Sequence, residues 1–197
     1  EDPKKQIRTE GVSNSEITVK STEKKSSFIY NKDSTKISWE AYKTTEKKGV
    51  QGRFTEFTIS GTQEGKTPQN VFTNASFVIQ TNSVKTGMVI RDNRIMNNFF
   101  KVFVNTSTIT GKIKKINEKK AVLEICINQI TKDIPVKVIS TENNFSLDGR
   151  IDLGLFNGQP AVDSLNYVCK EVHKGPDGIT KLWPDVAISV STILTVK

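Results

Sequence analysis

The sequence predicts an all-β protein, an antiparallel barrel of about eight strands, and three observations support this fold class. From residue 28 onward, apolar side chains recur at every second position, which is the period of a strand with one buried face. The apolar segments are short and follow one another at hairpin spacing, as in closed or sandwiched β architectures. No internal repeat or heptad period competes with this pattern. We therefore expect one barrel domain over 27–197, preceded by a flexible leader over 1–26.

Each expected strand can be placed by its alternating apolar positions. Between Phe54 and Phe57 the alternation changes phase, so we expect a bulge or bend near Glu56 that returns both sets of side chains to the interior. The sets that share a face are Ile37, Trp39 and Ala41; Val50, Gly52 and Phe54; Ala75, Phe77 and Ile79; Ala121, Leu123, Ile125 and Ile127; Ile134, Val136 and Val138; alternate positions of 145–155; and alternate positions of 186–196.

Two segments have helical rather than strand periodicity. Residues 84–98 place apolar side chains at steps of three and four, which predicts a short amphipathic helix. Residues 160–174 do the same, with Pro160 at the start and the sequence Gly-Pro-Asp-Gly at 175–178 after the end. The apolar stripe expected for this second helix consists of Leu165, Val168, Cys169 and Val172.

The N-terminal composition indicates export. Residues 1–26 are mostly Ser, Thr, Glu, Lys and Asn, a composition typical of a tether. The sequence starts at Glu1 without an initiator Met, as a mature chain does after a signal peptide is removed. No run of about 20 apolar residues predicts a membrane helix. We expect a periplasmic, cell-envelope or secreted protein, tethered to a membrane through a lipid anchor that precedes Glu1.

The charge is strongly positive, and its distribution bears on the choice of partner. The net charge is +8, and the densest basic stretch is 101–120, which reads as two strands around a turn. A solvated hairpin tip explains this stretch better than a lipid phosphate does. Basic residues adjoin aromatic ones at Arg53-Phe54 and Phe100-Lys101, but these aromatic side chains are expected inside the barrel, so no nucleic-acid partner is expected.

Catalytic and metal chemistry find little support in the sequence. His173 is the only histidine, and neither a nucleophile elbow nor a nucleotide-binding loop is present, so we expect no enzyme activity. Cys169 and His173 have a helical spacing that zinc ligands use, but a closed zinc site needs four ligands, so no metal is expected. Cys126 and Cys169 are expected to be buried free thiols rather than a disulfide.

One stretch resembles a known family. The sequence RDNRIMNNFF at 91–100 is similar to the signature of the YceI-like family, an Arg-Asp pair followed by paired phenylalanines. Ser38-Trp39, Gly52-Arg53-Phe54 and ITKDIPVKV at 130–138 match other parts of the family pattern in the expected order. The resemblance covers roughly 28–155 and extends through the closing strand toward Lys197. It departs from the pattern where Ala41-Tyr42 replaces a common histidine and where Ile130 replaces a glycine.

The resemblance implies a lipocalin-like, eight-stranded barrel that encloses a hydrophobic tunnel in a periplasmic protein. Its ligand would be a polyisoprenoid, an isoprenoid quinone or a similar lipid, and no other cofactor is expected. The oligomeric state is expected to be a monomer or a homodimer. The alternative function is a secreted scaffold or stress-related protein that binds an anionic partner through its basic loops.

The expected ligand-binding residues come from the inward strand phase and from the family signature, and each can also be read as ordinary core. Arg91 can bind a pyrophosphate or quinone oxygen, or it can pair with Asp92 and pin the helix. Phe99 is expected to anchor the helix, and Phe100, at the start of the next strand, to line the tunnel. The full set is Trp39, Phe54, Phe77, Ile79, Arg91, Asp92, Phe99, Phe100, Ile125, Ile127, Leu147 and Ile151.

Overall fold

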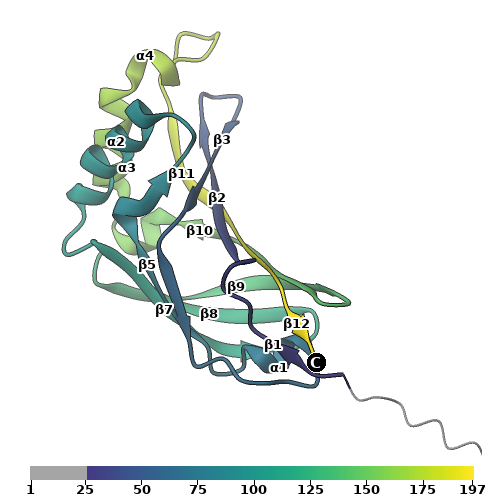
Figure 1. Cartoon of the computed structure of the whole chain (residues 1–197). Helices are drawn as coiled ribbons and strands as arrows, with labels where there is room; N and C mark the ends of the chain where they lie inside the picture. The colour runs from purple at the N-terminus through teal and green to yellow at the C-terminus, as the bar shows by residue number, and fades with distance from the viewer. Residues whose placement is uncertain (1–25) are drawn as a thin grey trace, which may run out of the picture.

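A computed structural model describes residues 26–197 and confirms the antiparallel β architecture (Figure 1). A curled ten-stranded sheet forms the body, three short α-helices cover one end of it, and a small two-stranded sheet lies at the other end. The structure therefore has more strands than the eight expected. Apart from Ser26, the leader expected over 1–26 lies outside the described residues.

The ten strands are antiparallel throughout and follow one another in space as β4-β5-β7-β8-β9-β10-β11-β2-β3-β6. Their bounds are β2 (Lys36–Lys43), β3 (Lys48–Phe54), β4 (Phe57–Ser60), β5 (Ser76–Gln80), β6 (Val84–Lys85), β7 (Thr108–Ile116), β8 (Lys120–Ile127), β9 (Ile130–Thr141), β10 (Asn144–Asp152) and β11 (Leu182–Ile193). The small sheet pairs β1 (Phe28–Ile29) with β12 (Thr195–Val196).

The sheet curls because one bent segment belongs to both of its ends. β3 pairs with β2 and β6, whereas β4 pairs with β5 at the far end of the strand order. Only Thr55 and Glu56 separate the two strands, so the bend lies at the expected place. Ser83 stabilises the bend, because its Oγ accepts hydrogen bonds from the amides of Thr55 (3.2 Å) and Glu56 (3.0 Å). The bend divides one long segment into two strands, which accounts for part of the larger strand number.

Both expected helices exist, but with different bounds. The first, α2 (Val89–Asn98), begins five residues later than expected, because Val84 lies in β6 and Gly87 takes a left-handed backbone with φ +82°. The second is divided into α3 (Gln159–Val168) and α4 (Lys170–His173) at Cys169. The remaining helical elements are α1 (Pro68–Val71) and the 3₁₀ turns η1 (Thr81–Ser83), η2 (Phe100–Val102) and η3 (Leu153–Phe156).

The core lies inside the curl of the sheet. Alternate residues of the strands point inward, and β8 shows this most regularly, with Ala121, Leu123, Ile125 and Ile127 all buried. α3 contributes Ala161 and Val162, which are almost completely buried. The expected stripe of this helix is therefore partly wrong: Val168 and Val172 are exposed, because the break at Cys169 turns α4 out of line with α3.

Candidate functional site

An almost entirely apolar cavity lies between the inner face of the sheet and the helical cover. Its volume is about 340 Å³, within the range of small-molecule sites. Its walls come from β2, β3, β10 and β11 on the sheet side and from α2, η2, α3 and α4 on the other. Almost all of the wall is apolar, so this main cavity suits a ligand that makes few hydrogen bonds.

A second, inner cavity of about 110 Å³ continues from the main cavity toward the opposite end of the sheet. It is also almost entirely apolar, and it extends the hollow into the core between β5, β7, β8 and β10. The two cavities share wall residues, so they adjoin rather than lie apart. The shared residues are Trp39, Phe54, Ile109, Ile127, Ile151 and Ile188.

The structure brings all but one of the expected ligand-binding residues to these two cavities. The main cavity is lined by Trp39, Phe54, Arg91, Phe99, Phe100, Ile127 and Ile151. The inner cavity is lined by Trp39, Phe54, Phe77, Ile79, Ile125, Ile127, Leu147 and Ile151. Asp92 lines neither cavity. The strand period identified inward positions, and the structure shows that these positions border hollow space.

The expected pairing of Arg91 with Asp92 is wrong. The buried Asp92 carboxylate accepts hydrogen bonds from the backbone amide (2.8 Å) and the hydroxyl (2.7 Å) of Thr86, so it fixes the turn before α2. Arg91 turns toward the main cavity instead, and its Nη2 lies 3.0 Å from the Met88 sulfur. No carboxylate within residues 26–197 forms an ion pair with Arg91.

The paired phenylalanines lie only partly as expected: Phe100 lines the cavity, but it does not begin a strand. Phe100 begins the 3₁₀ turn η2 rather than a strand, and both rings line the main cavity. Phe99 contacts Phe100 edge to face at 5.1 Å between ring centroids, and it contacts Phe103 in the same way. Phe54 approaches Phe100 from β3. The motif therefore builds an aromatic wall across the cavity, and both of its rings belong to that wall.

Sequence reasoning missed several polar residues of the main cavity. Lys43, Arg94 and His173 line it with Arg91, and neither Lys43 nor Arg94 has an ion-pair partner in the described part of the chain. The Lys43 ammonium donates to the carbonyl of Val172 at 2.7 Å. Burial lowers the pKa of Lys43, and the nearby charges of Arg91 and Lys48 lower it further.

His173, the last residue of α4, is buried. Its Nδ1 lies 2.9 Å from Asn166 Oδ1, which can accept a hydrogen bond from it. Desolvation lowers the pKa of His173 to about 4, and the positive charges of Lys43 and Arg94 contribute to the shift. The ring is therefore neutral at pH 7. Cys169 and His173 do not form part of a cluster of three or more metal-ligating side chains in residues 26–197.

Two more expectations concern cysteines and lysines. Neither Cys126 nor Cys169 forms a disulfide, although Cys126 is only half-buried. The basic stretch 101–120 does form the expected turn between β7 and β8. Within it, Lys112 and Lys114 form ion pairs with Glu124, and Lys114 also pairs with Asp133, so these two lysines are partly neutralised.

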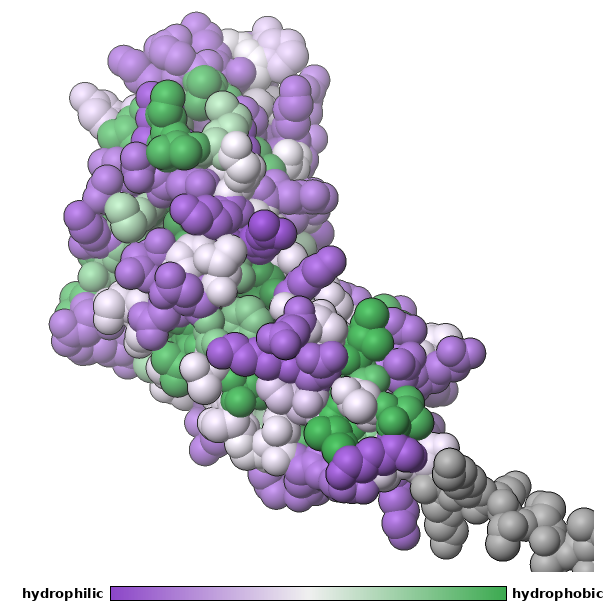
Figure 2. Space-filling model, viewed as in Figure 1, coloured by the Kyte–Doolittle hydropathy of each residue, from purple (hydrophilic) through white to green (hydrophobic). Residues whose placement is uncertain are grey.

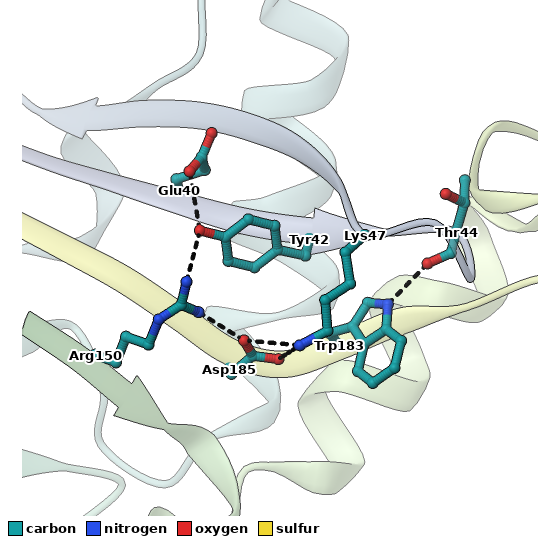
Figure 3. Close-up of polar contacts among 7 residues, drawn as sticks. All are labelled: Glu40, Tyr42, Thr44, Lys47, Arg150, Trp183 and Asp185. Atoms are coloured by element: carbon teal, nitrogen blue, oxygen red, sulfur yellow. Dashed lines mark hydrogen bonds and ion pairs between the residues drawn. The ribbon is translucent and has the colours of Figure 1, made fainter.

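A polar network holds the rim of the main cavity in place (Figure 3). Trp183 belongs to the cavity wall, and its indole Nε1 donates to the carbonyl of Thr44 at 2.7 Å. The Lys47 ammonium lies 4.3 Å above the Trp183 ring and 3.3 Å from a carboxylate oxygen of Asp185. Asp185 also accepts from Arg150 at 2.8 Å. These contacts fasten the β2–β3 hairpin to β10 and β11 beside the cavity.

No described helix is long and apolar enough to cross a membrane. No curated protein is similar enough to the chain to count as a match. Solved structures do share its fold. A polyisoprenoid-binding domain from Saccharophagus degradans, implicated in plant cell wall breakdown, aligns with a TM-score of 0.59 at 12% identity, over 88% of this chain and 99% of that one.

Two further structures are similar in fold. BcnA of Burkholderia cenocepacia has a TM-score of 0.51 and 16% identity, over 83% of this chain and 96% of its own. The YceI protein of Campylobacter jejuni has a TM-score of 0.52 and 21% identity, over 76% and 86%. The sequence itself matches the YceI-like domain over residues 28–192. The chain therefore belongs to the YceI-like domain family.

Proposed function

We propose that this protein is a non-catalytic carrier or sequestering protein for one long apolar ligand, an isoprenoid lipid or quinone, in the periplasm or cell envelope. The observation that carries the proposal is the pair of adjoining cavities, which together offer an almost entirely apolar space. The likeness to a domain described as polyisoprenoid-binding supports the choice of ligand.

The arrangement of polar groups supports an orientation for the ligand. Arg91, Arg94 and Lys43 border the main cavity, so an oxygen-bearing head group would lie near them. The apolar tail would extend past Trp39 into the inner cavity. Trp39 Nε1 is shielded from solvent and has no hydrogen-bond partner within residues 26–197, so it would be available as a donor to a carbonyl or hydroxyl of the ligand.

Native mass spectrometry and lipid extraction of the protein, purified without detergent, test the proposal. A bound apolar molecule is expected in the wild type. Ala41→Phe places a ring in the main cavity, because Ala41 lines it, and this variant should lose the ligand. The matched control is Ala187→Phe. Ala187 lies on the neighbouring strand opposite Glu40, the residue before Ala41, and it lines neither apolar cavity. Equal occupancy in both variants would refute carriage in this cavity.

A further inference from the structure

Figure 2 shows exposed apolar side chains at the end of the molecule that carries the helices, and a second group at the opposite end; the most exposed ones belong to the helical end. Soluble monomers seldom expose contiguous apolar patches, and such a patch marks a surface that binds a membrane or another protein. Seven large apolar side chains of residues 26–197 are more than half exposed, and one of them, Val104, follows the turn η2. The other six belong to the start of α2, to α3 and α4, and to the loop that follows: Met88, Val89, Ile90, Tyr167, Val172 and Ile179.

This apolar surface surrounds the opening of the main cavity. Met88, Ile90 and Val172 are exposed and also belong to the cavity wall, so they lie where the cavity meets solvent. Val89, between the first two, is 73% exposed. The left-handed turn at Gly87 and the hydrogen bond from the Thr86 amide to the Asp92 carboxylate hold this segment in place. We call this area the entrance surface. It consists of Met88, Val89, Ile90 and Val172 together with the basic side chains Arg91 and Lys43.

The entrance surface is basic as well as apolar. The segments 43–48, 84–94 and 170–181 contribute nine Lys and Arg residues against four Asp and Glu. Two of these cations contact the apolar residues directly: Arg91 lies against the Met88 sulfur, and Lys43 bonds to the carbonyl of Val172. Apolar side chains beside an excess of cations are typical of surfaces that bind anionic lipid bilayers.

We propose that the entrance surface docks on an anionic lipid bilayer, with Met88, Val89 and Ile90 inserted at the boundary between head groups and acyl chains. This proposal rests on the proposed function, because an apolar ligand would then pass between bilayer and cavity without crossing water. A second copy of the chain fits less well, since two identical basic surfaces would repel each other. Lipid phosphates instead neutralise the excess charge.

Vesicle flotation of the full chain tests this docking. The vesicles are phosphatidylcholine alone, or phosphatidylcholine with about one third phosphatidylglycerol. We expect the wild type to float with the anionic vesicles and to be released at high salt. The variant Met88→Ser/Val89→Ser/Ile90→Ser should bind roughly tenfold more weakly or worse. The matched control, Val104→Ser/Ile139→Ser/Ile193→Ser, changes exposed apolar residues elsewhere and should float like the wild type.

Several outcomes would overturn the proposal. These are equal flotation of the two triple variants, equal binding of the wild type to neutral and anionic vesicles, or a concentration-dependent dimer that the entrance variant abolishes without any vesicle binding. Uptake of the apolar fluorophore N-phenylnaphthylamine in solution reports the cavity separately. The single variant Val89→Ser changes an exposed residue that lines neither apolar cavity, so it should take up the fluorophore normally and float less well than the wild type; this result supports docking and shows that the fold is intact. A wild type that floats but takes up no fluorophore supports docking and overturns carriage.

Discussion

His173 makes the stability of this protein depend on pH in a range where few other groups titrate. It is the only histidine of the chain, it is 8% exposed, and its pKa is lowered from 6.5 to about 4. Below pH 6.5 the unfolded chain takes up a proton on this ring that the folded chain does not. The free energy of unfolding therefore falls as the pH drops from 6.5 toward 4, and the full contribution is present above 6.5.

The size of the effect follows from the shift. Each unit of pKa shift corresponds to about 1.4 kcal/mol, so lowering the pH from neutral to about 5 should cost roughly 2 kcal/mol through this group alone. Urea unfolding of the wild type and of His173→Gln at the two pH values measures it. The variant cannot take up this proton, so its free energy of unfolding should fall by roughly 2 kcal/mol less than that of the wild type.

A second variant identifies the cause of the shift. Lys43→Met removes one of the two positive charges that disfavour protonation of His173, so its pH dependence should be shallower than that of the wild type. Desolvation, the largest cause, remains in this variant, so the dependence should not vanish. If His173→Gln and the wild type lose the same stability between the two pH values, the assignment of the pH dependence to this buried ring is wrong.

Three other substitutions test the cavity and its frame. Phe100→Ala should lower the free energy of unfolding by urea by about 2–4 kcal/mol, less than Phe156→Ala at about 3–5 kcal/mol. The reason is that Phe156 is fully buried in the core, whereas Phe100 already borders empty space. The reverse order would contradict an open cavity. Gly52→Val should displace the Trp39 indole, because an added Cβ would overlap it. The variant should lose about 1–3 kcal/mol in free energy of unfolding and shift its tryptophan emission. An unchanged emission spectrum would argue against this packing. Asp92→Ala should cost about 1–3 kcal/mol by thermal unfolding, since the part-buried amide of Thr86 before α2 loses its acceptor; a neutral effect would contradict a stabilising role of this carboxylate.

The strand pattern could be predicted from the sequence because it follows from local chemistry. Alternation in β8 places every second residue in the core, and the change of phase around Glu56 marks a real bend. The helical pattern was less informative, because apolar residues at helical spacing do not show where a helix starts or breaks. Gly87 and Cys169 set those points through their backbone conformations, and neither residue type alone identifies a boundary.

The polar part of the candidate site could not be predicted, for a physical reason. Lys43, Arg94 and His173 lie on three different elements, and only the curl of the sheet and the break between α3 and α4 bring them to one cavity. Each residue is unremarkable in its own segment. A lysine at the end of a strand normally reads as solvated, and the single histidine on a short helix gives no pattern at all.

Several departures from the sequence-based expectations lie close together, and their location supports the proposed site. The late start of α2, the break at Cys169 and the changed partner of Asp92 all lie around the main cavity. Sequences that fold reliably agree across local pattern and global packing, and they depart from this agreement chiefly where function demands it. A solid scaffold would have no reason to place Lys43, Arg91 and Arg94, which have no ion-pair partner in the described residues, at the edge of a hollow. A protein that must admit an apolar chain at that edge does have one, because the opening has to interrupt the packing that the rest of the barrel maintains.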